Sequence, residues 1–203
     1  MEKVSEMDRL IVNLGVLICL FTLVYSGRPL VYRTILPDSR PSSIAVGYDN
    51  GLAFVFDPIR GGISYAWTGP FLDLEPTWTG KLIKPARVLG KVFFRDARDL
   101  PFRKGNPEIE SEFVFKGYDV GPERITFFYL LDGSPVEQIV TPLKTEDKEA
   151  LHIQFKVADP GESYWLLLSP QPQARITSPE AEQIENCLKF QGKETYSVVI
   201  QHD

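Results

Sequence analysis

The sequence predicts a mainly β protein: an antiparallel β-sandwich, or a partly open barrel, preceded by one transmembrane α-helix. Three observations support this prediction. One uncharged apolar run lies near the N-terminus, at residues 10–27. No later stretch repeats apolar residues with helical spacing over three turns. Short apolar runs instead alternate with Gly, Pro, Asn and Asp, which is typical of antiparallel strands joined by tight turns.

The run at residues 10–27 holds eighteen residues and no charge. As a helix it would span about 27 Å, close to the roughly 30 Å of a bilayer's hydrocarbon core. We therefore predict a single membrane anchor, whose residues include Leu10, Leu14, Leu17, Phe21 and Tyr25. Val24 and Ser26 would also suit cleavage of a signal peptide. The three acids and two bases of residues 1–9, however, do not form the basic region that such a peptide needs.

Turn residues divide residues 30–95 into short segments. The expected strands are 30–36, 43–47, 52–56, 63–67 and 92–95. Asn50-Gly51 favours a type I′ hairpin between the second and third of these, because both central residues of that turn need a positive φ. The first four strands are therefore expected to form an antiparallel meander.

The β pattern strengthens in the second half of the chain. The expected strands are 124–131, 136–140, 149–157, 163–169, 187–190 and 196–201. Asp132-Gly133 marks a hairpin between the first two. Apolar residues occupy every second position from Leu151 to Val157, which predicts a half-buried strand. Residues 96–107 are expected to form an exposed loop, and residues 179–184 one helical turn.

Composition argues against several classes of protein. The formal net charge is −5 and no cluster of Lys and Arg occurs, so nucleic acid is not an expected partner. Cys19 and Cys187 belong to no metal or haem motif, and no nucleotide-binding glycine motif is present, so no cofactor or metal is expected. His152 and His202 would need adjacent strands to share a metal or a catalytic role; we expect both to be exposed.

Residues 64–80 concentrate aromatic side chains, carboxylates and prolines, and strands are expected on both sides of them. Two roles fit this segment. Trp67, Asp73 and Trp78 could line a carbohydrate-binding surface, and the Asp73–Glu75 pair could serve glycoside hydrolysis. Alternatively, the tryptophans fill the core, Asp73 caps a turn and Glu75 faces solvent, which is the role we expect of such residues.

Several segments resemble a β-rich domain of large secreted bacterial proteins that also carry c-type haem or sugar-dehydrogenase-like modules. The matching segments are R-T-I-L-P (33–37), S-I-A-V-G-Y (43–48), A-F-V-F-D (53–57), S-Y-A-W-T-G-P-F-L-D (64–73), T-W-T-G (77–80), P-A-R-V-L-G (85–90), F-K-G-Y-D-V (115–120), I-T-F-F-Y (125–129) and D-G-S-P-V-E (132–137). The resemblance implies a domain with no catalytic motif, outside the cytoplasmic membrane and near electron-transfer machinery. This sequence departs from the pattern, since it holds neither module and an apolar run precedes the domain.

These observations predict a cytoplasmic tail and transmembrane anchor at residues 1–28 and a periplasmic β-sandwich at residues 29–203, in the bacterial inner membrane. The bases flanking the apolar run slightly favour the opposite orientation; the resemblance decides for the periplasm. The leading hypothesis is a non-catalytic accessory subunit that binds the bilayer through its anchor and other subunits of a respiratory or photosynthetic membrane complex. The alternative is a carbohydrate-binding or carbohydrate-active domain.

Overall fold

The computed structural model describes residues 27–79, 84–144 and 149–203. The predicted anchor residues Leu10, Leu14, Leu17, Phe21 and Tyr25 lie outside these ranges. Within the ranges, no helix has both the length and the apolar character needed to span a bilayer. The described residues instead form antiparallel β-sheets and one short 3-10 helix, so the mainly β prediction is confirmed.

The first sheet has five strands. Their order is β1 (Leu30–Arg33), β2 (Ile44–Gly47), β3 (Leu52–Asp57), β4 (Gly62–Thr68) and β7 (Lys91–Arg95). The first four form the predicted antiparallel meander. Every residue of β2 and β3 is buried, because other elements cover both faces of this sheet. Coverage on both faces explains why β2 and β3 read as almost continuous apolar runs instead of alternating ones.

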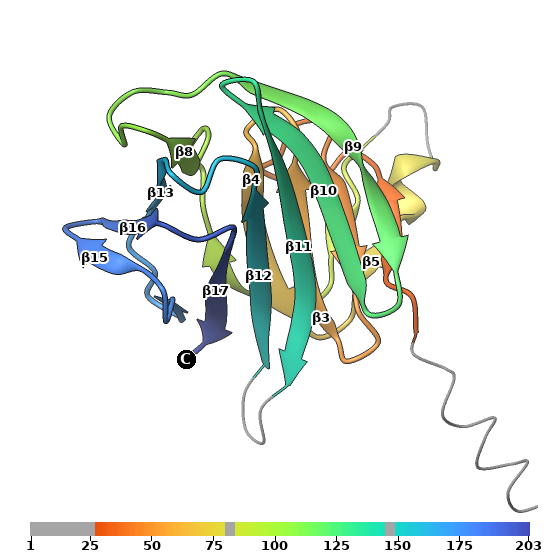
Figure 1. Cartoon of the computed structure of the whole chain (residues 1–203). Coiled ribbons are helices and arrows are strands. Elements are labelled where there is room, and N and C mark those ends of the chain that lie inside the picture. Colours follow the sequence, from red (N-terminus) through yellow and green to blue (C-terminus); the bar gives the residue numbers. More distant parts are fainter. Residues whose placement is uncertain (1–26, 80–83, 145–148) are drawn as a thin grey trace, which may run out of the picture.

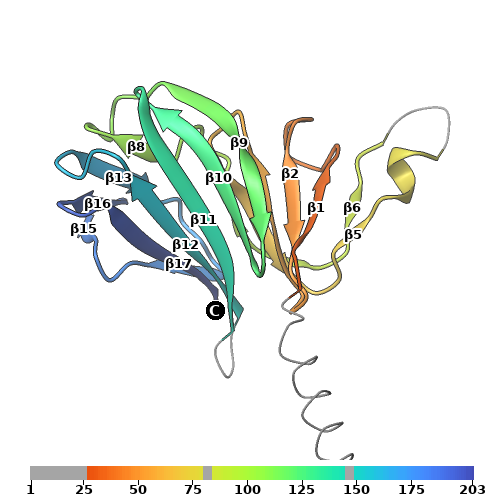
Figure 2. The same ribbon diagram turned by 45° about the vertical axis from the view of Figure 1, so that its right-hand side comes forward.

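The second sheet has six strands and packs face to face against the first (Figures 1 and 2). Its order is β14 (Ala174–Thr177), β17 (Thr195–His202), β12 (Glu149–Val157), β11 (Ser134–Lys144), β10 (Arg124–Leu131) and β9 (Phe113–Gly121). A four-stranded sheet adjoins it, formed by β15 (Glu182–Ile184), β16 (Cys187–Gln191), β13 (Ser163–Leu167) and β8 (Phe102–Lys104). The described sheets stay separate, so they form a sandwich and not a closed barrel.

Aromatic side chains dominate the main core between the two large sheets. The rings of Phe56 and Phe127 stack with centroids 3.9 Å apart, and those of Phe102 and Phe155 with centroids 4.0 Å apart. Each of these rings is almost fully buried. Burial of large aromatic rings is among the strongest contributions to core stability. The first pair therefore holds the two large sheets together, and the second joins β8 of the four-stranded sheet to the six-stranded sheet.

A second, smaller core lies on the opposite face of the five-stranded sheet. It is covered by residues 70–79 and 84–90, which carry β5 (Leu72–Asp73), the 3-10 helix η1 (Glu75–Thr77) and β6 (Arg87–Val88). Figure 2 shows β5 and β6 standing beyond β1 and β2, away from the six-stranded sheet. We call this segment the flap. The aromatic segment predicted from the sequence therefore builds a core of its own.

The turns agree only in part with the prediction. At Asp132-Gly133 both residues have a positive φ, so the expected two-residue hairpin is present. The Asn50-Gly51 hairpin differs, because Tyr48 N donates to Leu52 O and only Gly51, at φ 84°, is left-handed. That geometry is a three-residue loop ending in a glycine bulge, and the type I′ prediction is wrong.

Six of the described strands are absent from the predicted set, namely β5, β6, β8, β9, β14 and β15. β8 lies inside the residues expected to form an exposed loop, because Phe102 is buried against Phe155 and Tyr164. β15 occupies part of the expected helical turn at residues 179–184, which is therefore wrong, and pairs with the neighbouring β16. β14 precedes that turn and pairs with the distant β17. Local sequence patterns carry no sign of the long-range contacts that form β8 and β14.

Candidate functional site

The three candidate ligand residues have different environments. Trp67 lies in β4 and is 0% exposed. Asp73 lies in β5, in the flap, and is partly exposed. Trp78 follows the 3-10 helix of the flap and is 68% exposed. A ligand at the surface can therefore reach Trp78 and part of Asp73, whereas Trp67 presents no surface to it.

Trp67 is the centre of the second core. Its indole stacks on Phe71 with centroids 5.8 Å apart and an interplanar angle of 9°. Its Nε1–H donates to Pro70 O over 3.2 Å, which satisfies the one polar group of the side chain. Gly90 lies so close to the indole that a Cβ at this position would overlap it. These contacts give Trp67 the role of a core residue that holds the flap on the sheet.

Asp73 is engaged within the flap. Its carboxylate accepts hydrogen bonds from the Arg87 guanidinium directly across the β5–β6 pair, including one from Nε over 2.9 Å, and from Glu75 N over 2.9 Å. The Arg87 guanidinium is the main reason that the pKa of Asp73 lies below its ordinary value. Asp73 therefore stays ionised at neutral pH and caps the turn that begins η1, as the structural alternative expected.

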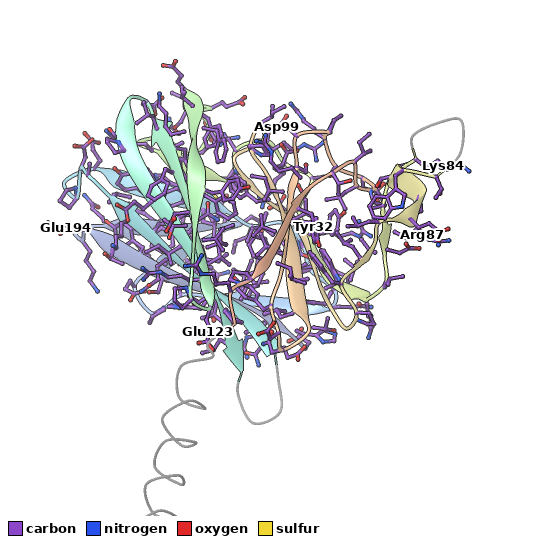
Figure 3. All side chains as sticks on the ribbon, turned by 90° about the vertical axis from the view of Figure 1, so that its right-hand side faces the viewer. Tyr32, Lys84, Arg87, Asp99, Glu123 and Glu194 are labelled. Atoms are coloured by element: carbon purple, nitrogen blue, oxygen red, sulfur yellow. The ribbon has the colours of Figure 1, made fainter. Side chains whose placement is uncertain are left out.

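A free edge strand lies beside the second core. β1 ends the five-stranded sheet, and among the described residues it pairs only with β2. Leu30 is 53% exposed and Tyr32 is 41% exposed. The Tyr32 ring lies 6.0 Å from Phe71, so an aromatic series runs from the surface inward to Trp67. Figure 3 shows Tyr32 on the side of the molecule that bears β1.

The edges formed by β7 and β9 are protected. On β7, the Gln171 side chain accepts from Arg95 N over 3.2 Å and donates to Arg95 O over 2.7 Å, so it pairs with the strand as a neighbouring backbone would. On β9, the register with β10 shifts at Lys116-Gly117, where Gly117 has φ 141°. Bulges and lysines are known devices against the addition of a further strand. β1 has no bulge and no lysine, and its one charged residue, Arg33, stands at its last position.

The sequence prediction missed Leu30, Tyr32 and Gln171. Leu30 and Tyr32 lie in a predicted strand, but nothing in one sequence shows which strand ends a sheet. The Pro-Gln-Pro-Gln run at residues 170–173 was a detectable signal, since prolines cannot donate to a sheet and often border edge strands.

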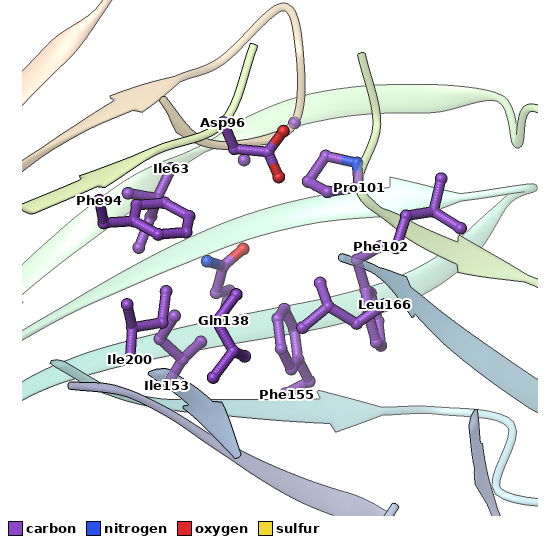
Figure 4. A pocket seen from close by; sticks show the side chains of 14 residues that line it. Ile63, Phe94, Asp96, Pro101, Phe102, Gln138, Ile153, Phe155, Leu166 and Ile200 are labelled. Carbon is purple, nitrogen blue, oxygen red and sulfur yellow. The ribbon is translucent and has the colours of Figure 1, made fainter. Parts of the chain in front are cut away.

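A small cavity lies between β4, β7, β12 and β13. Apolar side chains form most of its wall, and the Gln138 amide points into it (Figure 4). Gln138 is 2% exposed and its Oε1 accepts from the Tyr129 hydroxyl over 3.3 Å. The free space is about 40 Å³. That volume suits a few water molecules and is far below the roughly 300 Å³ or more of small-molecule sites.

Two charged pairs hold loops in place. Asp57, fully buried, accepts from Ile59 N and Arg60 N, and its other oxygen lies 3.9 Å from Arg60 Nε. Lys104 Nζ lies 2.7 Å from Asp159 Oδ2, and this hydrogen bond is the main cause of the lowered pKa of Asp159. These pairs connect turns to strands, which is a structural role.

The two histidines lie on adjacent strands but on opposite faces. His152 Nδ1 lies 3.4 Å from Thr141 Oγ1 on the outer face of β12, whereas the His202 ring packs 5.1 Å from Phe93 of the other sheet. Among the residues that the structure describes, no three His, Cys, Asp or Glu side chains gather as metal ligands. The two histidines therefore do not form a shared site.

Comparisons with known proteins add no relative to this description. No protein-family model, no curated protein and no solved structure matches the chain.

Proposed function

We propose that this chain is a membrane-anchored, non-catalytic accessory subunit. Its partner is a subunit of a bacterial electron-transfer membrane complex, respiratory or photosynthetic, which it binds through the free edge of β1. The anchor is the apolar run at residues 10–27. The periplasmic location and the electron-transfer setting rest on the resemblance found in residues 33–141. The unprotected β1 edge is the observation that carries the proposal.

Strand addition is the binding mode that fits this edge. A strand at the end of a sheet leaves the N–H and C=O groups of every second residue unpaired, and an extended segment of another protein can pair with them. Ala86 N donates to Ile35 O just after β1, and Glu123 N donates to Gly27 O just before it. These hydrogen bonds pair the backbone just before and just after β1, whereas the outer edge of β1 itself has no neighbouring strand among the described residues.

Side chains on the edge would give such binding its specificity. Leu30 and Tyr32 project on the face that carries the second core, next to the partly exposed Phe71. A partner strand with apolar residues at alternate positions would cover them and exclude water from the new hydrogen bonds. Burying such side chains releases about 25 cal/mol for each Å² of apolar surface.

The position of β1 also favours a partner from the same membrane. Only Arg28 and Pro29 separate the end of the apolar run from Leu30, so the edge begins within about 10 Å of the run. With the β1 edge this close to the membrane surface, the polypeptide that can most easily reach it is a juxtamembrane segment of a neighbouring subunit.

The test is to place charges on the edge. In the full-length tagged chain, the double substitution Leu30→Lys and Tyr32→Lys should reduce recovery of the partner subunit by about tenfold or more, since an approaching strand would have to desolvate both ammonium groups. Ile59→Lys is the matched control, because Ile59 is 54% exposed but lies in the β3–β4 hairpin, away from the edge.

Gentle detergent extraction followed by quantitative identification of co-purifying chains measures this recovery. Deuterium exchange of the β1 amides should also slow in the complex relative to the isolated chain. Equal recovery with the edge variant and the control, or β1 amides that exchange equally fast in both states, would refute strand addition.

A further inference from the structure

We infer that the end of the sandwich where the chain enters lies against the phospholipid headgroups. We call it the entry end. It consists of residues 27–30, 49–51, 89–91, 122–124 and 142–143. The inference rests on the proposed anchor and adds a second, lipid-binding surface to it, separate from the anchor itself.

Contacts between both large sheets bring these segments together. Glu123 N donates to Gly27 O over 3.2 Å, and Gly27, Asn50, Glu123 and Pro142 line one depression. Thr68 pairs with Leu52 on one side and with Lys91 on the other. Leu52 directly follows residues 49–51 and Lys91 directly follows Leu89–Gly90, so these two turns lie at the same end of the sheet. Glu123 marks this end at the bottom of Figure 3, and Asp99 marks the opposite end.

The length of chain before the first strand fixes the height of the entry end. The uncharged run ends at Gly27 and β1 begins at Leu30. Three residues extend by at most about 10 Å. The headgroup layer on each side of a bilayer is about 5–8 Å thick. An anchor formed by the run therefore holds the entry end at the headgroups and leaves no room for a hydrated spacer.

The exposed side chains of the entry end suit that position. Leu30 and Leu89 are each 53% exposed and Leu143 is 39% exposed, and they come from three separate strands or turns around the entry point. Isolated exposed leucines are ordinary at a protein surface. At a membrane entry point, however, Leu89 and Leu143, which the proposed partner strand leaves uncovered, can each insert into the apolar part of the interface.

The distribution of charge gives the same orientation. The opposite end carries the exposed carboxylates Glu108, Glu110, Glu112 and Asp132, whereas Asp99 at that end is paired with Arg40 and Arg60. At the entry end the exposed bases Arg28, Lys91 and Arg124 offset the acids Asp49 and Glu123. Anionic lipids repel an acidic surface and tolerate a balanced one, so the acidic end is expected to face away from the bilayer.

Site-specific labelling tests the inference in the full-length chain. In a background of Cys19→Ser and Cys187→Ser, single substitutions Leu89→Cys and Leu143→Cys each carry an environment-sensitive fluorophore. Ile109→Cys is the control, since Ile109 is 64% exposed and belongs to the loop before β9, at the acidic end. The protein is reconstituted into vesicles of phosphatidylethanolamine and phosphatidylglycerol, with no partner protein present.

We expect the fluorophores at 89 and 143 to be quenched by iodide roughly threefold less than the one at 109, and to be quenched by nitroxide-labelled lipids. If all three are equally open to iodide while the chain stays in the vesicles after alkaline washing, the inference is wrong and the anchor stands. If the chain washes off the vesicles, the proposed anchor fails and the inference falls with it.

Discussion

Trp67 and Trp78 provide the sharpest test of the second core, because substitution by alanine should greatly lower the free energy of unfolding at Trp67 and hardly change it at Trp78. Trp67 is 0% exposed. Folding removes about 200 Å² of its surface from water, which at about 25 cal/mol per Å² is worth about 5 kcal/mol. Truncation also removes the indole Nε1–H group, which donates a hydrogen bond to Pro70 O. Trp67→Ala is therefore expected to lower the free energy of unfolding by about 3–5 kcal/mol.

Trp78→Ala is the matched control. The side chain is 68% exposed, so its removal should change the free energy of unfolding by less than about 0.5 kcal/mol. Denaturation of the full chain by guanidinium chloride, followed by β-sheet circular dichroism, measures both variants. Trp67→Phe keeps a ring in the core and serves if the alanine variant does not fold. Similar losses at the two positions would refute the packing of the flap described above.

Three further predictions follow from the described contacts. Asp159→Asn should lower the melting temperature at about pH 7 and lower it less at about pH 2. The hydrogen bond from the Lys104 ammonium group lowers the carboxyl pKa in the folded state. Its stabilisation is therefore present above the unfolded-state pKa and is lost as pH falls through the folded-state pKa. An equal loss at both pH values would contradict this. Gln171→Ala should speed deuterium exchange at the β7 edge and destabilise by about 1 kcal/mol; unchanged exchange would mean that the amide does not protect that strand. Gly90→Ala should lower the melting temperature by several degrees, because its Cβ would overlap an indole and a backbone oxygen, whereas Gly161→Ala meets no atom and should be neutral.

Features set by neighbouring residues were predictable from the sequence. Glu149–Val157 alternates in burial as its pattern indicates, and the Asp132-Gly133 hairpin has the expected positive φ values. Both depend on interactions within a few residues. Phe102 was assigned to a loop because charged residues and prolines surround it, yet rings on two other strands bury it. Such long-range burial has no signature in the local sequence.

The candidate site shows the same limit more sharply. The tripeptide Trp-Thr-Gly occurs twice, at residues 67–69 and 78–80, yet the first indole is fully buried and the second is mostly exposed. Their local sequences are alike, so only the position of the flap on the sheet distinguishes them. The exposure of Leu30 and Tyr32 was equally hidden, since it depends on β1 being the last strand of its sheet.

The direct passage from Gly27 into β1 has a mechanical consequence. Only Arg28 and Pro29 lie between Gly27 and the strand, and Pro29 is buried, so tension on the chain before Gly27 reaches the β1–β2 ladder without a slack linker. A pull away from the entry end acts along β1 and loads all of its hydrogen bonds to β2 in shear, instead of peeling them apart one by one. A domain connected in this way would tilt together with the chain that precedes Gly27. It would also resist unfolding by force on that chain far better than a four-residue strand suggests.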